Sequence, residues 1–379
     1  MRLGIDASNL RSGGSITHIA ELIRWGDPEA HGIAKVTLWG AAITLERVPE
    51  RPWLDRVHVP QLERPLPMRV AWQLFKRPAL ARAACDVLFT PAATPPGGFH
   101  PLVSMSQLTL PFDARERRRY GFSADHARLL ILRYVIGSSF RQADAVIFLT
   151  DFAKETIGRL VDHGIDARSV VIPHGVSTYF QAPPRPALPL DAYSVVNPFR
   201  FVYVSDQHPY KHQATVAEAV LRMRRAKMPI ELDLIGSPVI PSVARELQKT
   251  LARHPAERDA VRIMNSVPHS ALPEFYREAG AFVFASTCEN LPVTLLEAMA
   301  SGLPIVASDA RPMPDIIGDA GTYFDAEDVA SIEAALRRVA EDRELRERSA
   351  ALAYERAAAY SWKKCADATF ALLARVGRV

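Results

Sequence analysis

Two glutamates flank the start of a predicted helix, where they could accept hydrogen bonds from sugar hydroxyl groups. Glu289 precedes this helix and Glu297 lies about two turns into it, within the segment 288–308. The unpaired amides and the positive dipole end of a helix N-terminus favour an anion such as a diphosphate. Hydroxyl acceptors beside an anion site predict that this segment binds a nucleotide sugar.

Three further residues define the helix that carries Glu297. Asn290 suits an N-cap, and Pro292 suits a first turn, where a backbone N–H has no partner in any case. Gly302 suits the C-terminal stop, directly before the apolar run 303–308. We therefore expect the helix to begin beside Glu289 and to lie between two buried strands.

Lys211 and a glycine pair are the other candidates for holding phosphate. Lys211 follows the apolar run 201–205 and opens a helical pattern, so it should lie at the carboxyl edge of a parallel sheet, where such folds bind ligands. Gly13 and Gly14 follow the first apolar run and precede a helix, which lets the backbone approach a ligand closely. A solvated lysine and a plain glycine turn are the alternatives.

Short apolar runs alternate with longer helical patterns in both halves of the chain. This rhythm predicts parallel sheets that helices cover on both faces, hence an α/β protein. The chain has 379 residues, more than one typical domain, which favours two cores. The predicted strands are Leu3–Asp6, Lys35–Trp39, Asp86–Thr90, Leu102–Met105, Ala145–Leu149, Val170–Pro173, Phe201–Ser205, Leu232–Ile235, Val261–Met264, Ala281–Ala285 and Leu303–Ala307.

The composition is that of a globular protein, with 48% hydrophobic and 23% charged residues. Three cysteines lie far apart without a Cys-x-x-C, which predicts neither a disulfide framework nor a zinc site and favours a reducing compartment. The first residues indicate a strand rather than a leader, and the chain has no apolar run of 18 residues. We therefore expect a cytoplasmic protein that does not span a membrane.

Several classes of enzyme lack their signatures in this sequence. Neither half contains the Gly-x-Gly-x-x-Gly of classical dehydrogenases, and no Walker loop is present. The absence of Asp-x-Asp gives no indication of a metal held by paired carboxylates. We predict no metal and no cofactor, the nucleotide sugar itself being a substrate.

Glu289-x7-Glu297 followed by Ala-x-Ala-x-Gly-x-Pro-x-Val resembles the donor site of retaining glycosyltransferase family four, the group 1 glycosyl transferases. The resemblance implies the GT-B fold, in which two Rossmann-like, doubly wound parallel-sheet domains face each other across a cleft. It also implies that Glu297 binds the nucleotide ribose and Glu289 the hydroxyl groups of the donor sugar. By position, Asn290, Leu291 and Pro292 would supply amides to the distal phosphate and the sugar.

The same resemblance assigns roles outside this segment. Lys211 matches the lysine that neutralises the departing diphosphate, and Gly13 and Gly14 match the loop beneath the donor phosphates. The arginine usual before that lysine is missing, and His208 is one candidate to replace it. The catalytic candidates are therefore Lys211 and Glu289.

Two residues of the first half match places where the family contacts the sugar or joins its domains. Gln107 occupies the position of a histidine that in many relatives meets the donor sugar. His174 precedes Gly175 at the expected junction of the domains, where a hinge histidine without substrate contact is the alternative.

Prolines in 181–189 suit an extended linker between the halves. A C-terminal helix that crosses back onto the first domain is implied by the resemblance. The expected parts are an acceptor-binding domain at 1–182, the linker at 183–197, a donor-binding domain at 198–358 and the crossing helix at 359–379.

A basic stretch lies in the first half. Arg64 to Arg141 contains 12 Arg plus Lys against 4 Asp plus Glu, a local balance of +8. Its first part, from Arg64 to Arg82, interleaves basic residues with Trp72 and Phe75, a composition typical of contact with an anionic membrane. The basic residues of this part that would face the membrane are Arg69, Lys76, Arg77 and Arg82. An ordinary surface helix is the alternative. We expect no nucleic acid partner, because the stretch has no recognised binding motif and the rest of the chain is near neutral.

The function expected from these observations is that of a metal-independent retaining glycosyltransferase. It would transfer a sugar from GDP-mannose or a UDP-sugar to a glycan or lipid-linked acceptor, in the synthesis of a bacterial surface polysaccharide. We expect a cytoplasmic enzyme with a peripheral position at the inner face of the membrane. The alternatives are another GT-B enzyme, such as a sugar-nucleotide epimerase or a phosphorylase, and a non-catalytic nucleotide-sugar-binding protein.

Overall fold

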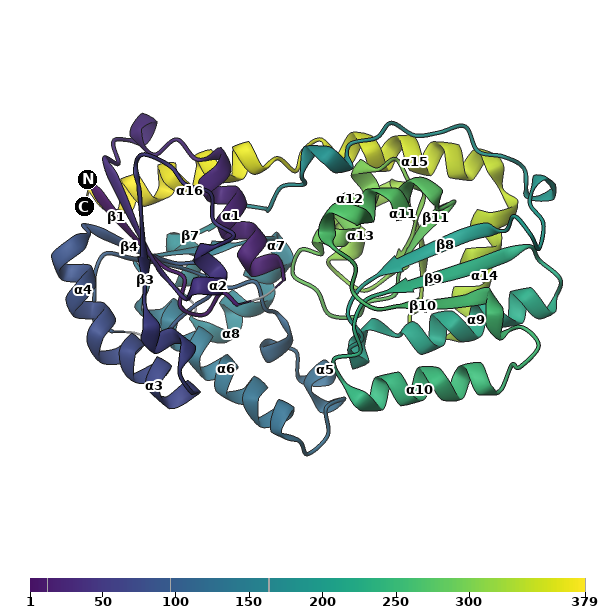
Figure 1. The fold of residues 1–379 in the computed structure, drawn as a ribbon, viewed down its shortest axis with the longest axis horizontal. Coiled ribbons are helices and arrows are strands. Elements are labelled where there is room, and N and C mark those ends of the chain that lie inside the picture. Colours follow the sequence, from purple (N-terminus) through teal and green to yellow (C-terminus); the bar gives the residue numbers. More distant parts are fainter. Residues whose placement is uncertain (12, 96, 163, 379) are drawn as a thin grey trace. The chain divides into compact units, whose positions relative to one another are not determined.

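The computed structural model describes residues 1–11, 13–95, 97–162 and 164–378, which form two compact units (Figure 1). Each unit is a parallel sheet with helices on both faces, so the predicted pair of doubly wound α/β domains is confirmed. The chain passes from unit 1 to unit 2 after Gly175 and returns after Tyr360, and the predicted limits at 182 and 358 stay predictions. Unit 1 comprises Met1–Arg117, Gly121–Gly175 and Ser361–Val379, and unit 2 comprises Arg118–Tyr120 and Val176–Tyr360.

Within its described residues, unit 1 has a seven-stranded sheet in the order β3-β2-β1-β4-β5-β6-β7. Strands β4, β5 and β6 are buried along their whole length, as expected where helices cover both faces. The edge strand β3, which the sequence pattern missed, is largely exposed. The strands are β1 (Arg2–Asp6), β2 (Lys35–Gly40), β3 (Leu54–His58), β4 (Val87–Thr90), β5 (Leu102–Met105), β6 (Ala145–Phe148) and β7 (Ser169–Val171).

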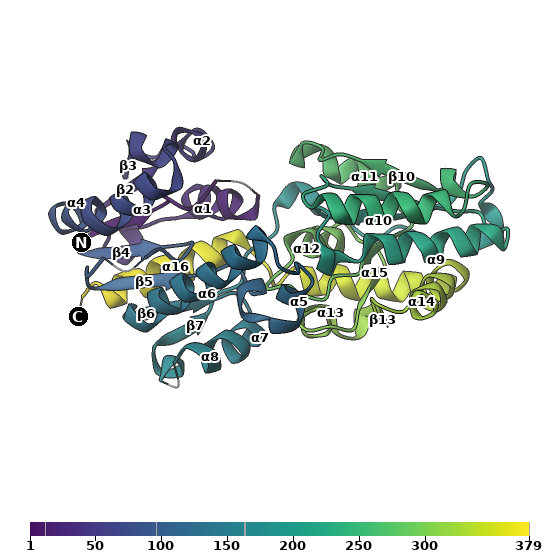
Figure 2. The same cartoon turned by 90° about the horizontal axis from the view of Figure 1, so that it is seen from below.

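The helices of unit 1 cover both faces of this sheet. Figures 1 and 2 show α1 and α16 against one face and α4 and α6 against the other. Helix α16 comes from the end of the chain and packs beside α1, which follows the first strand. The helices are α1 (Gly14–Trp25), α2 (Ala42–Leu45), α3 (Leu66–Ala71), α4 (Arg77–Ala84), α5 (Ala114–Arg118), α6 (Ala124–Gln142), α7 (Asp151–Ala153), α8 (Arg159–Val161) and α16 (Trp362–Val376).

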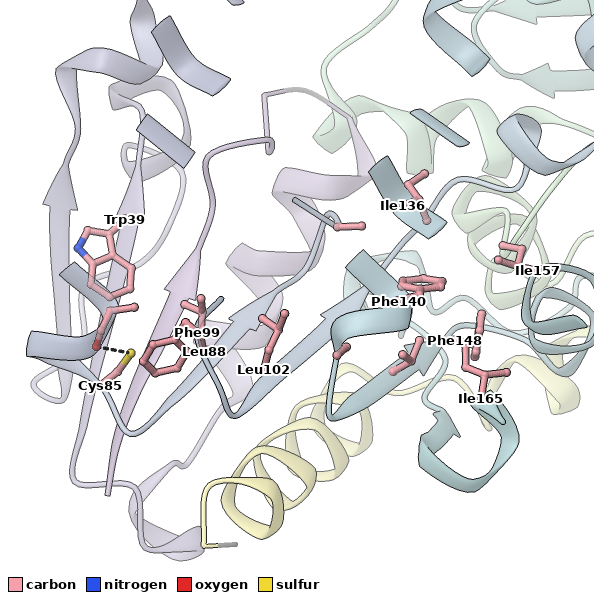
Figure 3. Close-up of a cluster of buried hydrophobic side chains, with 14 of the residues drawn as sticks. Trp39, Cys85, Leu88, Phe99, Leu102, Ile136, Phe140, Phe148, Ile157 and Ile165 are labelled. Carbon is pink, nitrogen blue, oxygen red and sulfur yellow. Dashed lines mark hydrogen bonds between the residues drawn. The ribbon is translucent and has the colours of Figure 1, made fainter. Parts of the chain in front are cut away.

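An apolar cluster joins the sheet of unit 1 to its α4 and α6 face (Figure 3). Phe140 of α6 meets Phe148 of β6 edge-on, with ring centroids 5.5 Å apart. Cys85, directly after α4, donates its thiol hydrogen to the Ala81 carbonyl over 3.2 Å, the contact dashed in Figure 3. Burial raises the pKa of the Cys85 thiol to about 12, so this cysteine is a packing residue rather than a nucleophile.

The basic segment 64–82 differs from one amphipathic surface helix. It consists of α3, a π-helical turn at Trp72–Lys76 and α4. Trp72 belongs to the apolar cluster of unit 1, and Arg77 is buried, whereas the Phe75 side chain is 75% exposed. Only part of the predicted membrane-facing set therefore faces solvent.

The described part of unit 2 has a six-stranded sheet in the order β10-β9-β8-β11-β12-β13. Strand β13 was missed from the sequence, because it is short and opens on a glycine. The strands are β8 (Phe199–Val204), β9 (Ile230–Ile235), β10 (Val261–Met264), β11 (Ala281–Phe284), β12 (Ile305–Ser308) and β13 (Gly321–Phe324).

The helices of unit 2 also form two layers. Figures 1 and 2 show α9, α10 and α14 on one face of the sheet, with α11, α12, α13 and α15 on the other. No helix within the described residues combines the length and the apolar character that crossing a bilayer requires. The helices are α9 (Gln213–Arg225), α10 (Pro241–Ala252), α11 (Leu272–Glu278), α12 (Val293–Ala300), α13 (Met313–Ile317), α14 (Val329–Glu341) and α15 (Arg343–Ala357).

Each sheet has one point where its strand order reverses. In unit 1 this switch point lies between β1 and β4, and in unit 2 between β8 and β11. Ligands of open α/β sheets bind outside the carboxyl ends of the strands at such a point, because the connecting loops diverge there. The loops after β8 and β11 are therefore the first place to look for a site in unit 2.

Candidate functional site

The switch point of unit 2 brings Lys211 and Glu289 together, although 78 positions separate them. Lys211 ends the 3-10 turn Pro209–Lys211 after β8, and Glu289 lies in the loop after β11. The Lys211 ammonium pairs with the Glu289 carboxylate, and the two side chains are 11% and 14% exposed. A cation that is largely shielded from water but still reachable is suited to meeting a phosphate group.

Backbone and ring contacts fix the two loops that carry this pair. The Tyr203 hydroxyl of β8 donates to the Lys211 carbonyl over 2.7 Å. The Thr287 amide donates to the Tyr210 carbonyl over 2.9 Å, which ties the loop after β11 to the loop after β8. Lys211 Nζ also lies 4.8 Å from the centroid of the Phe284 ring, a favourable cation–π distance. The lysine is therefore held in place before any ligand arrives.

Helix α12 begins later than the sequence pattern predicted. Its N-cap is Pro292, in an extended conformation, so the prediction of Asn290 as the N-cap is wrong by two residues. The reason is local: a proline disfavours the helical conformation at the residue before it, here Leu291, so the helix starts only at Val293. Gly302 follows the helix with φ +65°, which confirms it as the stop.

The predicted amide donors around Glu289 need one correction. Pro292 cannot donate, because proline has no backbone N–H. Asn290 and Leu291 are both buried beside Glu289, and their amide roles stay predictions. The first amide of α12 with an intrahelical acceptor is that of Leu295, so the amides of Val293 and Thr294 are the helix groups suited to an anion.

Glu297 lies inside α12 with only 1% of its surface exposed. His269 Nε2 lies 2.6 Å from Glu297 Oε1, and Oε2 has no hydrogen-bond partner among the described residues. Burial raises the pKa of Glu297, and the hydrogen bond from His269 partly opposes that rise. A buried carboxylate oxygen without a partner is costly, so it marks a place where a ligand hydroxyl would be stabilising.

The glycine pair and Gln107 lie close together in unit 1. Gly13 caps α1 with φ +59°, a backbone conformation that favours glycine, and Gly14 begins the helix. A Cβ atom on Gly14 would lie 3.8 Å from Gln107 Oε1. Gln107 Nε2 is buried and finds no acceptor within the residues the structure describes. The structure thus groups these three predicted residues, and their contact with a donor stays a prediction.

His174 is enclosed in the interior of unit 1. Its ring stacks on His18 with centroids 4.5 Å apart and lies 5.1 Å from the Trp362 ring of α16. Burial lowers the pKa of both histidines, to about 4 for His18. A Cβ atom on Gly175 would lie 2.0 Å from the Trp362 amide nitrogen, so this close approach requires glycine. Burial therefore favours the neutral form of both rings, and a contact of His174 with substrate stays a prediction.

His208 lies in the loop after β8, three positions before Lys211. Its Nδ1 atom is 3.3 Å from the Tyr120 hydroxyl, and its ring stacks on Tyr210 with centroids 5.3 Å apart. The side chain therefore belongs to the same edge of the sheet as Lys211. Its predicted role in place of the missing arginine stays a prediction.

Sequence reasoning missed His269 and Tyr276, which both act on Glu297. His269 follows β10 after a short loop, and Tyr276 lies on the next helix, α11. Because loops that follow parallel strands meet at one edge of the sheet, a histidine after β10 could have been placed near α12 from its position alone. Its pairing with Glu297 depends on packing that no local pattern contains.

The described residues contain no group of three or more His, Cys, Asp or Glu side chains arranged to hold a metal ion. The unit 2 site offers a cation, two carboxylates and a helix N-terminus. These groups can neutralise a diphosphate and orient hydroxyl groups.

Comparisons with known proteins find a family model and several relatives that match part of the chain. Residues 193–356 match the model of the family "Glycosyl transferases group 1". The O-antigen chain mannosyltransferase B of Escherichia coli is 27% identical over 64% of this chain and 63% of its own length. A D-inositol 3-phosphate glycosyltransferase of Geodermatophilus obscurus is 29% identical over 62% of this chain and 54% of its own. The chain thus spans less than two thirds of the length of these two relatives.

Solved structures resemble nearly the whole chain. A sucrose-phosphate synthase from Thermosynechococcus elongatus has a TM-score of 0.72 at 16% identity, covering 97% of each chain. WaaG, a glycosyltransferase of lipopolysaccharide biosynthesis, has a TM-score of 0.69 at 14% identity, covering 98% of this chain and 99% of its own. At such identities the likeness concerns the fold, which is GT-B. Residues 193–356, most of unit 2, thus resemble the group 1 glycosyl transferases, and the whole chain has the GT-B fold.

Proposed function

We propose that this protein transfers a sugar from a nucleotide diphosphate sugar to a glycan or lipid-linked acceptor. The observation that carries the proposal is the Lys211–Glu289 pair at the switch point of unit 2, beside the N-terminus of α12. In this assignment Lys211 and the first amides of α12 hold the diphosphate. Glu289 binds hydroxyl groups of the sugar, and Glu297 presents Oε2 to the ribose.

The reaction needs charge stabilisation rather than a protein nucleophile. The bond between the anomeric carbon and the diphosphate oxygen breaks, and a bond from that carbon to the acceptor oxygen forms. Negative charge grows on the diphosphate as its bond loosens, and Lys211 lowers the barrier by neutralising it. Attack from the face that the diphosphate leaves would retain configuration and pass the acceptor proton to the departing phosphate oxygen.

The names of relatives and neighbours suggest which donors to test. One relative is named for mannosyl transfer, which supports GDP-mannose, and one neighbour, HepE of Anabaena, was solved with UDP and with UDP-glucose. A relative named for O-antigen chain synthesis and a neighbour involved in lipopolysaccharide biosynthesis support a role in bacterial surface polysaccharide synthesis.

A two-stage experiment tests the proposal. A panel of nucleotide sugars is first screened for the one that raises the melting temperature most. That donor is then supplied with and without candidate acceptors, and release of nucleoside diphosphate is followed, with Lys211→Met as the matched inactive control. Binding without any turnover would favour a non-catalytic binding protein. Altered sugar nucleotide without transfer would indicate an epimerase, and phosphate-dependent release of sugar phosphate a phosphorylase.

We also propose that unit 1 contacts an anionic membrane surface from the cytoplasmic side. Phe75 and the basic side chains of Lys76 and Arg82 are exposed on the segment that follows α3. Ile131 and Tyr134 of α6 are 64% and 72% exposed. Apolar side chains beside cations suit an interface of lipid headgroups, where each cation contributes roughly 1 kcal/mol at low salt.

Vesicle co-sedimentation tests this contact. Binding should rise with the fraction of anionic lipid and fall with salt. Phe75→Ser with Lys76→Gln and Arg82→Gln should abolish it, while the same number of changes at exposed basic residues of unit 2, Arg245, Lys249 and Arg258, should not. Equal binding of neutral and anionic vesicles would remove this part of the proposal.

A further inference from the structure

Three side chains from three separate segments of unit 2 form a continuous chain of hydrogen bonds that ends on Glu297. Tyr179 comes from the 3-10 turn Thr178–Phe180, and His269 from the turn His269–Ala271. The Tyr179 hydroxyl lies 2.5 Å from His269 Nδ1, and His269 Nε2 lies 2.6 Å from Glu297 Oε1. No local sequence pattern joins them, because 90 positions separate Tyr179 from His269 and 28 separate His269 from Glu297.

The direction of these hydrogen bonds follows from the chemistry of the three groups. An ionised carboxylate only accepts, so His269 Nε2 must carry the hydrogen that Glu297 Oε1 receives. In a neutral imidazole the other nitrogen then has no hydrogen, so Nδ1 accepts from the Tyr179 hydroxyl. Tyr179 therefore fixes the tautomer of His269, and His269 occupies one oxygen of the carboxylate. Oε2 remains, without a partner in the described chain.

Aromatic packing holds the imidazole in this orientation. The His269 ring meets the Phe180 ring edge-on, with centroids 5.1 Å apart and an interplanar angle of 63°. Phe180 is 1% exposed and packs in turn against Tyr276, whose ring centroid is 5.8 Å away. Because Phe180 is buried between these two rings, its side chain restricts movement of the imidazole on one side.

We propose that His269 and Tyr179 are positioning residues of the donor site, which hold the Glu297 carboxylate so that Oε2 faces the ribose of a nucleoside diphosphate. This inference rests on the proposed function, in which Glu297 binds that ribose. It adds a determinant of ribose recognition that lies outside the helix carrying the carboxylate. Neither residue touches the reacting bond.

The arrangement has a consequence for pH dependence. The titratable groups that face the carboxylate are His269, Tyr276 on α11 and, through the imidazole, Tyr179. Burial raises the pKa of Glu297, and His269 is the larger of the two influences that lower it. Removing His269 should therefore raise this pKa further, so that the carboxylate loses its charge, and the protein its ribose acceptor, at a higher pH than in the parent.

Calorimetric titration with GDP and UDP, and with their 2′,3′-dideoxy analogues, tests the proposal. The parent should prefer the ribose forms, and Glu297→Gln should lose that preference because the amide is a poorer acceptor. His269→Ala should reduce the preference roughly tenfold, as expected for the loss of a charge-assisted hydrogen bond, and move the acid limit of binding to higher pH. His269→Gln, whose amide can donate to Oε1, should restore part of it, and Tyr179→Phe should cost a few-fold.

The outcomes separate the two levels of inference. If the parent binds neither GDP nor UDP, the proposed function fails and this inference with it. If the parent prefers ribose forms and His269→Ala keeps both that preference and the parent pH profile, only the positioning role is wrong. Should His269→Ala not fold, Tyr179→Phe and His269→Gln carry the same test, since both keep most of the packing. A purely structural role for His269 would lower the melting temperature without changing the ratio of ribose to dideoxy affinity.

Discussion

The two sheets place an ion pair at the same topological point, but the pairs differ in burial. In unit 1, Arg77 Nη1 lies 2.8 Å from Asp6 Oδ2 at the end of β1, and the side chains are 3% and 0% exposed. In unit 2, Lys211 and Glu289 pair outside β8 and β11 with 11% and 14% exposed. One crevice is thus closed by the protein's own groups, whereas the other keeps its charges within reach of a ligand.

The unit 1 pair is also more completely bonded. Arg77 donates to the Thr94 hydroxyl and, over 2.6 Å, to the Pro95 carbonyl. The Asp6 carboxylate accepts the Ser8 amide over 3.0 Å with its other oxygen. Shared topology therefore does not decide function, because deeper burial and additional hydrogen bonds separate a structural ion pair from one that can exchange its partner for phosphate.

The largest effect is expected from breaking the unit 1 pair. Asp6→Asn leaves the Arg77 guanidinium buried without its counter-charge, which should lower the free energy of unfolding by about 3–5 kcal/mol. Glu289→Gln, the same change at the unit 2 pair, should cost less than about 1 kcal/mol because water reaches that pair. Denaturant unfolding of both variants gives the comparison. Equal losses would mean that burial does not distinguish the two pairs.

Turnover should depend more on the ion pair of unit 2 than on that of unit 1. Lys211→Met should reduce kcat by roughly 10²–10³-fold, since it removes a cation from the developing diphosphate charge. Stability should hardly change. Donor turnover at saturating acceptor measures the effect, with Lys249→Met, on the exposed surface of α10, as a control for loss of one positive charge. A variant as active as the parent would show that Lys211 pairs with Glu289 only for structure.

Glu297→Gln should have a smaller effect than the two preceding changes. It should weaken binding but increase stability. Glu297→Gln should weaken nucleoside diphosphate binding by about 1–3 kcal/mol. Because burial raises the folded-state pKa of this carboxyl above its ordinary value, the parent should lose stability as pH rises from the ordinary to the folded-state pKa. The variant lacks this loss, so its melting temperature at neutral pH should exceed that of the parent. The measurement is the melting temperature of parent and variant at a series of pH values. The same pH dependence in both would contradict the assignment.

The smallest change is expected on removing divalent metal. If Lys211 and helix amides supply the positive charge in unit 2, a chelator should leave the rate of transfer nearly unchanged. The measurement is initial rate with and without chelator, followed by addition of magnesium or manganese. If the rate collapses in chelator and recovers with either ion, a metal ion must supply part of the positive charge that we assign to Lys211.

Local patterns predicted most of the fold, whereas long-range pairing was beyond them. Strands β5 and β10 are mainly apolar runs, and their predicted limits match the structure. β3 was missed because it is an exposed edge strand with a charged centre. The prediction that grouped Arg77 with membrane-facing cations was wrong, because its buried partner Asp6 lies 71 positions away and composition cannot reveal it.

The candidate site shows the same limit. The order of strands and loops was enough to predict that Lys211 and the glutamates share one edge, and the structure brings Lys211 to Glu289. The contact of His269 with Glu297 was not predictable, since it depends on how the turn after β10 packs against Phe180. Burial of a charged side chain is a property of the assembled layers.

The two units should become able to fold at different times during synthesis on the ribosome, because unit 1 requires helix α16. Unit 2 is almost continuous in the chain, whereas unit 1 needs Trp362 and Phe370, both buried, from the last helix. A chain emerging in order would thus expose the α1 side of the sheet of unit 1 until α16 has been made, while unit 2 could fold earlier. Synthesis of residues 361–378, rather than of the first 175 residues, would complete unit 1.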